Sequence, residues 1–332
     1  MKSINLKILI LVLLINFFSY SKEKANLIER QKYIMGTYIT IKLPPKYSNL
    51  FKPAFDIFKQ LDKKFSLYIP DSEINKINKN RCAFVSKDTV NIVKKALDIC
   101  KRTDGYFNIA VGGITYDMFG FGTEKEKIPS ENSLKAYSNL LSCDVVQIKN
   151  NRICIMKEGI KLDLGGIGKG YAVDKVARFF KKNDVNEGII LASGDIRCLS
   201  ECETFIKNPF NEGIVIKLFL DKDTSISTSG NYERFIKTKK YNHLINPKTG
   251  KPQENFASIT VLTKADNTIA DAYSTAISVM SLEKAKKFLK NHKSVAGILI
   301  TNDRRVFITK NIYSFSKVVL FFEDFPVKII DY

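Results

Sequence analysis

The sequence predicts an α+β fold, because strand patterns and helix patterns are mixed along the chain without a strict alternation. Apolar segments that alternate or are continuous predict strands over residues 37–43, 144–148, 152–155, 188–192, 258–262, 295–300 and 306–309. Apolar residues repeated every three or four positions predict helices over residues 47–65, 86–103, 169–180 and 268–280. A doubly wound parallel sheet would need regular βαβ units, which this pattern does not contain.

Local signals support these elements in order along the chain. The first strand alternates around Ile39, and the second helix stops at Asp104-Gly105. Asn150-Asn151 is a turn signal that joins the next two strands into a hairpin. The buried strand that follows the third helix ends in the sequence Ser-Gly-Asp, which is typical of a turn.

The last third of the chain is also predicted to contain mainly short strands. Several short strands are expected between residues 204 and 235, and residues 317–332 contain an apolar run that we interpret as a terminal docking strand without an assigned role. No segment rich in Pro, Gly or Ser divides the chain. With 332 residues and 45% apolar residues, we expect one unit with a substantial core.

The formal net charge of +19 comes mostly from scattered lysines. This distribution indicates a solvated surface, and attraction to an anionic ligand or a membrane surface is the alternative. Because the sequence contains no arginine-rich stripe or recognition motif, we expect no nucleic-acid partner.

The first 21 residues have the pattern of an export signal. Lys2 and Lys7 flank the start of an apolar run over residues 8–18, and Ser19-Tyr20-Ser21 has the small-x-small spacing of a cleavage site. The run is short for a membrane span. We therefore expect cleavage near Ser21 and a mature chain outside the cytoplasm, and an uncleaved N-terminal anchor is the alternative.

The chain contains six cysteines, at positions 82, 100, 143, 154, 198 and 202. An even number in an exported chain permits disulfides, and Cys198 and Cys202 are close enough to pair across a turn. The other pairings stay open, and inert core thiols are the alternative. Because there are only two histidines and no paired C-x-x-C motif, we expect no zinc site.

The segment KLDLGGIGKGYAVDK, residues 161–175, has four glycines before and at the start of a predicted helix. It matches neither the Walker A pattern nor the G-x-G-x-x-G fingerprint. Glycines let the backbone approach a ligand, the following helix directs its amide dipole at it, and Lys169 adds a positive charge. Asp163 suits an amide, ring N–H or hydroxyl of a ligand better than a phosphate. A tight packing turn is the alternative.

The predicted helix ADNTIADAYSTAISVM places Asp271 and Thr275 four residues apart on one face, with Ser274 beside them. These are hard oxygen ligands of the kind that Mg²⁺ prefers, with substrate phosphates and water completing its shell. A solvated acid beside a threonine bonded to its own helix is the alternative.

His243 lies in the segment YNHLINPKTGKP, ahead of a turn signal over residues 246–250. Histidine is the usual proton acceptor near neutral pH, and a structural histidine is the alternative. The other histidine, His292, lies among lysines and is expected on the surface.

Three further segments offer contacts to a ligand. Gly112-Gly113, expected after an apolar strand, allows close backbone approach. Tyr68 can stack on an aromatic ligand, and Met35 can pack against one.

In this combination and order, the motifs resemble the ApbE-type FAD:protein FMN transferases, the flavin transferases of the bacterial envelope. The similarity runs from about residue 31 to residue 309. The matching segments are Met35-Gly36-Thr37, Phe65-Ser66-x-Tyr68, Ser72-Glu73-Ile74-Asn75, Gly105-Tyr106-Phe107-Asn108, Ala110-Val111-Gly112, residues 163–171, Ser193-Gly194-Asp195, Ser227-Thr228-Ser229-Gly230, residues 243–247, Ala270-Asp271-Ala272 and Ser274-Thr275-Ala276.

The resemblance implies an ApbE-like, T-fold-related architecture. Its mixed, mainly antiparallel sheets are flanked by helices, and an FAD cleft lies between lobes. The resemblance implies a flavin transferase domain over residues 30–312. Residues 1–21 precede it as the signal peptide or uncleaved anchor, and residues 313–332 follow it as a C-terminal extension outside the resemblance.

The resemblance also implies an activity. With Mg²⁺, the family cleaves the pyrophosphate of FAD and attaches FMN by a phosphoester bond to a Thr or Ser of a target protein, releasing AMP. The positions that match its FAD contacts are Met35, Tyr68, Ala110, Val111, Gly112, Asp163, Lys169 and Ile245. The metal positions are the carbonyl of Gly166, Asp271 and Thr275, with Ser274 assisting. The catalytic positions are His243, as the base, and Asp271.

The implied partners are exported or membrane proteins with a D-x-x-[ST]-G-[AT]-[ST] acceptor motif. The implied location is the periplasm or the outer face of the inner membrane. Two departures are visible: many relatives have Ala where Gly168 stands, and the lipid-attachment cysteine of many exported members is missing. Two other functions stay open, a Mg²⁺-dependent FAD pyrophosphatase that uses water in place of the target hydroxyl, and a carrier that only binds FAD.

Overall fold

A computed structural model describes residues 26–264, 266–322 and 325–331. Its centre is a sheet of nine strands in the order β1-β2-β6-β7-β10-β11-β12-β13-β15, in which every neighbouring pair is antiparallel except β13 and β15. The strands are β1 Ile28–Ile34, β2 Thr37–Leu43, β6 Ile189–Ala192, β7 Asp195–Cys198, β10 Thr224–Gly230, β11 Phe256–Lys264, β12 Ala296–Thr301, β13 Val306–Thr309 and β15 Val327–Ile330. The α+β, mainly antiparallel architecture predicted from the sequence is confirmed.

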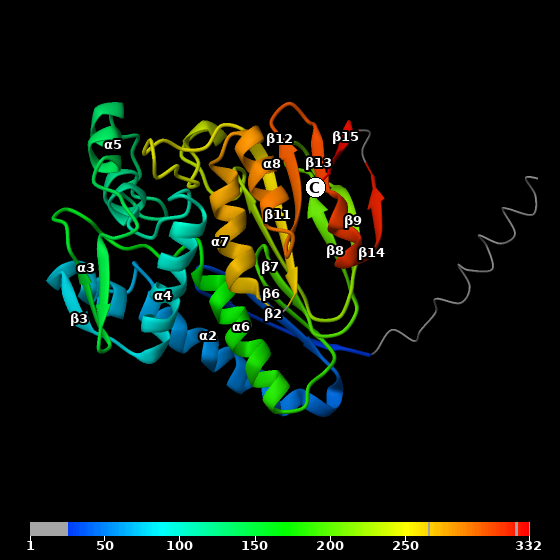
Figure 1. The fold of residues 1–332 in the computed structure, drawn as a ribbon. Coiled ribbons are helices and arrows are strands. Elements are labelled where there is room, and N and C mark those ends of the chain that lie inside the picture. The colour runs from blue at the N-terminus through cyan, green and yellow to red at the C-terminus, as the bar shows by residue number, and fades with distance from the viewer. Residues whose placement is uncertain (1–25, 265, 323–324, 332) are drawn as a thin grey trace, which may run out of the picture.

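Helices cover one face of this sheet (Figure 1). The helices of this layer are α2 Phe51–Phe65, α4 Lys87–Arg102, α6 Gly168–Lys182, α7 Asn267–Ser278 and α8 Leu282–Asn291. The buried side chains of α2 recur every three or four residues, as an amphipathic helix requires. Helix α7 packs on β10 and β11 and lies beside α6, so these two helices place their facing residues at the centre of the molecule.

A small sheet covers the other face over β10–β13 (Figure 1). Its order is β14-β9-β8, with bounds Ser316–Phe321, Ile214–Leu220 and Cys202–Lys207. Apolar residues of both sheets form one core, as in Leu218 and Ile216 against Ile226 and Ile298. The C-terminal tail therefore contributes two strands, β14 and β15, where the sequence predicts one docking strand.

A third group of elements lies beside the helix layer. It contains a sheet of order β3-β5-β4, with bounds Cys82–Phe84, Arg152–Ile155 and Val146–Lys149, together with α3 Glu73–Asn80 and α5 Glu131–Ser138. Asn150 and Asn151 both have positive φ, 47° and 60°, which is the type I′ geometry expected of the predicted hairpin.

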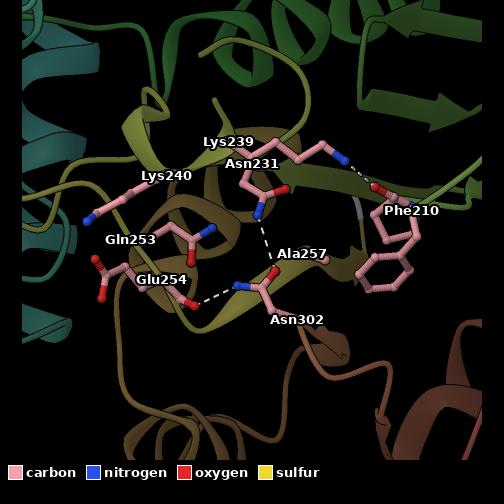
Figure 2. A pocket seen from close by; sticks show the side chains of 9 residues that line it. Phe210, Asn231, Lys239, Lys240, Gln253, Glu254, Ala257 and Asn302 are labelled. Carbon is pink, nitrogen blue, oxygen red and sulfur yellow. Dashed lines mark hydrogen bonds between the residues drawn. The ribbon is translucent and has the colours of Figure 1, made fainter. Parts of the chain in front are cut away.

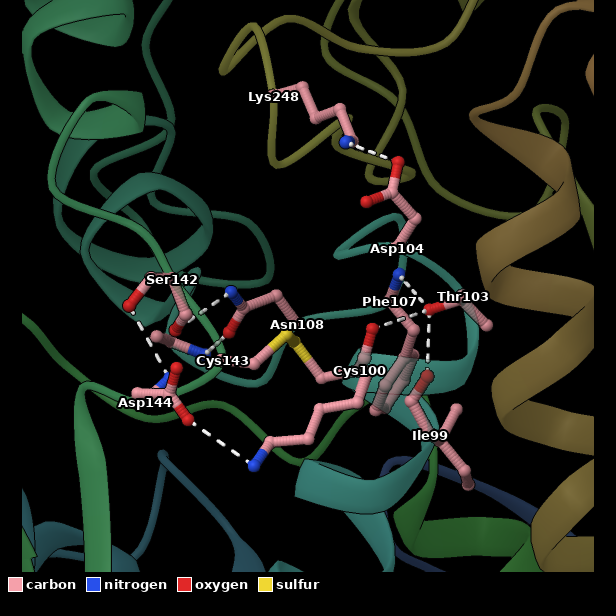
Figure 3. Close-up of a disulfide and its surroundings, with 12 residues drawn as sticks. Ile99, Cys100, Thr103, Asp104, Phe107, Asn108, Ser142, Cys143, Asp144 and Lys248 are labelled. Carbon is pink, nitrogen blue, oxygen red and sulfur yellow. Dashed lines mark hydrogen bonds and ion pairs between the residues drawn. A yellow bond between two sulfur atoms is a disulfide. The ribbon is translucent and has the colours of Figure 1, made fainter.

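All six cysteines form disulfides. The predicted pair Cys198–Cys202 is present. Cys82–Cys154 joins the directly paired residues of β3 and β5, and Cys100–Cys143 joins the end of α4 to the loop before β4 (Figure 3).

Some elements differ from the sequence-based expectation. The apolar strand expected before Gly112 is absent: the described residues there are irregular, with one isolated bridge between Val111 and Lys161, and Gly113 begins a short π-helix over Gly113–Met118. Buried apolar residues alone do not make a strand, because a strand also needs a neighbour with free backbone groups. The pattern also misses β1 and the helices α3, α5 and α8, which are short or rich in Lys and Asn.

The described residues contain no helix of the length and apolarity that a membrane crossing requires. The predicted export signal over residues 1–21 lies outside the described residues.

Candidate functional site

The glycine-rich segment before α6 folds around Asp163. Oδ1 of Asp163 accepts a hydrogen bond from the amide of Gly165 at 2.7 Å, and Oδ2 accepts one from the hydroxyl of Thr115 at 2.6 Å. The amide of Asp163 donates to the carbonyl of Ile109 at 2.7 Å. Asp163 thus braces this segment against residues 109–115, and its contact with a ligand stays a prediction.

Helix α6 begins at Gly168, and its first turn faces α7. The amide of Gly170 donates to Oδ2 of Asp271 at 3.0 Å, so an amide expected to face a ligand holds a carboxylate of the protein itself. The helices approach this closely because residue 170 has no Cβ. A Cβ there would lie 2.3 Å from the carbonyl oxygen of Asn267 and 2.8 Å from the Cβ of Asp271.

Three kinds of oxygen donor lie close together between the glycine segment and α7. A Cβ on Gly166 would lie 3.0 Å from Cγ2 and 3.1 Å from Oγ1 of Thr275, so the backbone of Gly166 rests on that threonine. Asp271 is one helical turn before Thr275 on the same face. A carboxylate, a hydroxyl and a carbonyl are hard donors that suit Mg²⁺.

This donor set is small. Across the described ranges, the structure contains no group of three or more His, Cys, Asp or Glu side chains arranged to hold a metal ion. An Mg²⁺ ion is commonly bound by one or two carboxylates, with water and substrate phosphates as its other ligands. The residues therefore fit a magnesium ion that binds together with a phosphorylated substrate.

Ser274, predicted to assist at the metal, is fully buried and faces the sheet. Its hydroxyl donates to the carbonyl of Asp271 at 2.9 Å and lies 2.8 Å from the hydroxyl oxygen of Ser229 and 3.3 Å from that of Ser227, both on β10. These contacts anchor α7 on β10. The arrangement adds no support to a role of Ser274 as a ligand.

Lys169 lies between two acids. Its Nζ is 3.6 Å from Oδ2 of Asp195 and 3.5 Å from the carbonyl oxygen of Gly165. Burial opposes the charge of Lys169, but the negative charges of Asp271 and Asp195 outweigh it and raise the pKa of this lysine. Lys169 therefore stays a cation, which suits the phosphates of a ligand.

The two acids are themselves buried. Burial, followed by the charge of Asp271, raises the pKa of Asp195, while the charge of Lys169 and a hydrogen bond from Ser227 oppose the rise. Burial also raises the pKa of Asp271, although Lys169 and the amide of Gly170 oppose it. Two buried carboxylates thus share one ammonium group, and a divalent cation would compensate their remaining charge.

His243 is held as a neutral base. Its Nδ1 lies 3.1 Å from the carbonyl oxygen of Arg234. Because a carbonyl only accepts, Nδ1 carries the proton and Nε2 keeps its lone pair. Burial lowers the pKa of His243 to about 4; the charges of Arg234 and Lys169 act in the same direction, while the bond to Arg234 opposes them. A neutral imidazole of this kind can take a proton from a hydroxyl.

Tyr68 is connected to His243 through Arg234. The hydroxyl of Tyr68 donates to the carbonyl of Phe121 at 2.7 Å and accepts from Nη1 of Arg234 at 3.3 Å. The residue is 50% exposed, and its ring meets Tyr116 edge to face. An aromatic ligand can therefore cover the exposed part of the ring.

The backbone around Gly112 is held by one phenol group. The hydroxyl of Tyr137 donates to the carbonyl of Ala110 at 3.1 Å and accepts from the amides of Gly113 at 3.1 Å and Lys161 at 3.0 Å. The amide of Gly112 donates to the carbonyl of Lys161 at 2.9 Å. This segment, predicted to contact FAD through its backbone, is thereby fixed to the start of the glycine-rich stretch.

The two remaining predicted FAD contacts differ in accessibility. Met35, in the turn between β1 and β2, lies beside the start of α6, because a Cβ on Gly168 would be 3.8 Å from its Cε. Ile245 is 7% exposed and belongs to the main core, two residues after His243. Met35 thus joins the group, whereas Ile245 presents little side-chain surface to a ligand.

Two hollows in the surface lie outside this group. One, of about 360 Å³, is lined in part by Phe210, Asn231, Lys240 and Gln253 and lies beside the loop that carries His243 (Figure 2). The other, of about 640 Å³, lies beside the disulfide Cys100–Cys143 (Figure 3). No predicted site residue lines either hollow, so the FAD cleft between lobes stays a prediction.

Sequence reasoning assigned no role to two residues that the structure places in the site. Asp195 stands in the Ser-Gly-Asp turn, and its position at the end of a buried strand was a usable signal. Arg234 holds both Tyr68 and His243, and no local pattern in the sequence identifies it.

The site combines the parts that phosphoryl transfer requires. Oxygen donors suit a divalent cation, an ammonium group suits a phosphate, and a neutral imidazole suits a hydroxyl nucleophile. Cleavage of a pyrophosphate depends mostly on positioning and on neutralisation of charge, which this group of residues can supply.

Known proteins resemble this chain over most of its length. A protein from Buchnera aphidicola subsp. Schizaphis graminum, named FAD:protein FMN transferase, is 30% identical over 325 residues, covering 90% of this chain and 93% of its own. A protein of the same name from Haemophilus influenzae is 28% identical, covering 79% of this chain and 81% of its own.

Solved structures share the fold. The ApbE protein from Thermotoga maritima has a TM-score of 0.80 and 24% sequence identity, covering 87% of this chain and 99% of that one. The apo flavinyl transferase ApbE of Pseudomonas stutzeri has a TM-score of 0.76, also at 24% identity, covering 87% of this chain and 96% of its own. The model of the ApbE family matches residues 35–299. The chain therefore belongs to the ApbE family.

Proposed function

We propose that this protein is a Mg²⁺-dependent FAD:protein FMN transferase, which cleaves FAD, attaches FMN to a Thr or Ser of a target protein and releases AMP. The observation that carries the proposal is the neutral imidazole of His243, held by the carbonyl of Arg234 at 3.1 Å in the same site as Lys169 and Asp271. The activity named for the curated relatives supports the same reaction.

Each part of the site has a task in this reaction. Asp271, Thr275 and the carbonyl of Gly166 would hold Mg²⁺, which when bound neutralises charge on the pyrophosphate. Lys169 neutralises further phosphate charge. The residues that would contact FAD are Met35, Tyr68, the backbone of Ala110, Val111 and Gly112, Asp163, Lys169 and, with little surface, Ile245.

The transfer step uses His243 as the base. Nε2 of His243 takes the proton of the target hydroxyl, and the hydroxyl oxygen attacks the phosphorus of the FMN half of FAD. A new phosphorus–oxygen bond forms to the target, and the pyrophosphate bond to the AMP half breaks. AMP leaves with the bridging oxygen and its electron pair, and His243 later returns its proton to solvent.

The location and partners follow from the same proposal. A protein exported to the periplasm or to the outer face of the inner membrane would modify exported or membrane proteins that carry the D-x-x-[ST]-G-[AT]-[ST] motif. The basic N-terminal region and apolar run over residues 8–18 support export. Association with the inner membrane is a further part of this proposal.

The experiment uses the purified protein with FAD, Mg²⁺ and a target that carries the acceptor motif. Flavin fluorescence of the target on a denaturing gel and released AMP are measured together. We expect a fluorescent target that is lost with EDTA. Release of AMP and free FMN without a fluorescent band would point instead to a pyrophosphatase, and bound FAD without AMP would leave only a carrier.

Variants of the two histidines test whether His243 acts as the base of the transfer step. His243→Ala should reduce transfer by roughly 100-fold or more, the usual contribution of a general base, while FAD binding changes little. The matched control is His292→Ala, because His292 lies at the end of α8, stacked on Phe288 and away from the site. Transfer by His243→Ala at the parent rate would show that the base is wrongly assigned.

A further inference from the structure

Asp195 is a buried acid whose partners are incomplete. The residue is 1% exposed, and its Oδ1 has no hydrogen-bond partner among the described residues. It follows the turn Ser193-Gly194 and pairs with Ser227 across β7 and β10, so its backbone is fixed by the sheet. An acid kept in such a place at a cost in desolvation needs a compensating role.

The cation nearest to Asp195 is Lys169, and the contact is asymmetric. Nζ of Lys169 forms an ion pair with Asp195 at 3.6 Å. Among the described ion pairs there is none between Lys169 and Asp271, although the charge of Asp271 acts strongly on the lysine. The lysine thus lies near both acids and pairs directly with only one of them.

Asp271, the acid that forms no ion pair with Lys169 among the described residues, is the one that the proposed metal site needs. Oδ2 of Asp271 accepts the amide of Gly170. Within the described part of the chain, no ion pair or side-chain donor occupies Oδ1 of Asp271, which leaves this oxygen for a cation. A lysine on Asp271 would occupy that oxygen.

We propose that Asp195 is a positioning residue: it holds the ammonium group of Lys169 away from Asp271 and so keeps the carboxylate of Asp271 open to the divalent cation. The inference rests on the metal-dependent function proposed above.

The physical reason is competition between two anions for one flexible cation. The lysine side chain has rotatable bonds and a compact charge, so it moves to the strongest available anion. If a neutral side chain replaced Asp195, Asp271 would remain as the buried acid whose charge acts on Lys169. The ammonium group would then pair with Asp271, and a divalent cation would have to displace it.

Mn²⁺ is a suitable probe, because it prefers the same oxygen ligands and its paramagnetic resonance signal reports the free ion. The measurement is made on the full protein with saturating FAD, because substrate phosphates would complete the shell of the cation, for the parent, Asp195→Asn, Lys169→Met and the double variant. Loss of an outer partner typically weakens metal binding, so Asp195→Asn should bind Mn²⁺ roughly 10- to 100-fold more weakly than the parent. The double variant should bind as tightly as Lys169→Met alone.

The control is Asp88→Asn. Asp88 also pairs with a lysine of α6, Lys175, at 2.7 Å, but it lies apart from the proposed metal ligands. Its replacement should leave the affinity for Mn²⁺ unchanged. If Asp195→Asn does not fold, comparison of the double variant with Lys169→Met still tests the inference, because the double variant removes both members of the Asp195–Lys169 ion pair together.

Three results would overturn the inference. The first is an Asp195→Asn protein that binds Mn²⁺ as tightly as the parent does. The second is a double variant that binds Mn²⁺ more weakly than Lys169→Met, which would mean that Asp195 acts on the metal directly. If the parent bound no Mn²⁺, the metal site and this inference would both fail. Absence of flavin transfer by a parent that binds Mn²⁺ as expected would instead count against the proposed transfer reaction alone.

Discussion

Gly170→Ala should force α6 and α7 apart at the metal site. The added Cβ would lie 2.3 Å from the carbonyl oxygen and 2.8 Å from the carbonyl carbon of Asn267, and 2.8 Å from the Cβ of Asp271. None of these atoms is the end of a flexible side chain, so the helices themselves must move. Overpacking costs about 1–3 kcal/mol, and a rigid backbone neighbour places this change at the upper end.

A gain in helix propensity offsets part of that cost. Replacing glycine by alanine inside a helix contributes about 1 kcal/mol, which leaves a net destabilisation of about 2 kcal/mol. At about 2 °C per kcal/mol for a chain of this size, Tm should fall by roughly 4 °C. Binding of Mn²⁺ should weaken as well, because Gly170 also holds the carboxylate of Asp271 through its amide.

Gly168→Ala is the matched control. Its Cβ would meet only Met35 Cε at 3.8 Å and Phe65 Cδ2 at 4.0 Å, which are ordinary contacts. We expect Tm to stay the same or rise and flavin transfer to be retained. Thermal unfolding followed by circular dichroism, with in-gel flavin fluorescence, compares the two variants. A Gly170→Ala protein that melts at or above the parent temperature and transfers flavin normally would refute the reasoning.

Asp174→Asn should lower the free energy of unfolding by about 3–5 kcal/mol, because the buried Arg197, whose guanidinium lies 3.7 Å from the carboxylate of Asp174, would lose its anion. Urea unfolding measures this free energy, and a change near zero would contradict the prediction. Tyr137→Phe should lower the free energy of unfolding by about 1–3 kcal/mol, because two amides and a carbonyl lose their shared hydrogen-bond partner. It should also weaken FAD binding, which calorimetry measures. The transfer rate should stay flat from about pH 7 down to about pH 5, because a pKa of His243 lowered to about 4 keeps the imidazole neutral over that range. An acid limb with its midpoint near the ordinary histidine value would contradict this assignment.

Much of the fold is encoded locally and was predictable. The strand over Thr37–Leu43, the hairpin at Asn150-Asn151 and the core of α4 rest on side-chain periodicity or on turn chemistry. These signals depend only on neighbouring residues. The short helices α3, α5 and α8 were missed, because eight to ten residues contain only two or three turns and therefore few repeats of an apolar position.

The sequence by itself determined the family, the likeness to a flavin transferase and the residues that carry its motifs. His243, Asp271 and Thr275 were recognisable because their residue types and spacing already suit a base and a metal ligand set.

Only the tertiary structure decided how these groups influence one another. Asp195 and Lys169 become an ion pair through the packing of α6 on β7, and Arg234 reaches Tyr68 across 166 positions of the chain. The physical reason is that burial and Coulomb interactions depend on distance in space and on exclusion of water. The pKa values of His243 and Asp195 therefore exist only in the folded protein, whereas the identities of these residues can be read from the chain.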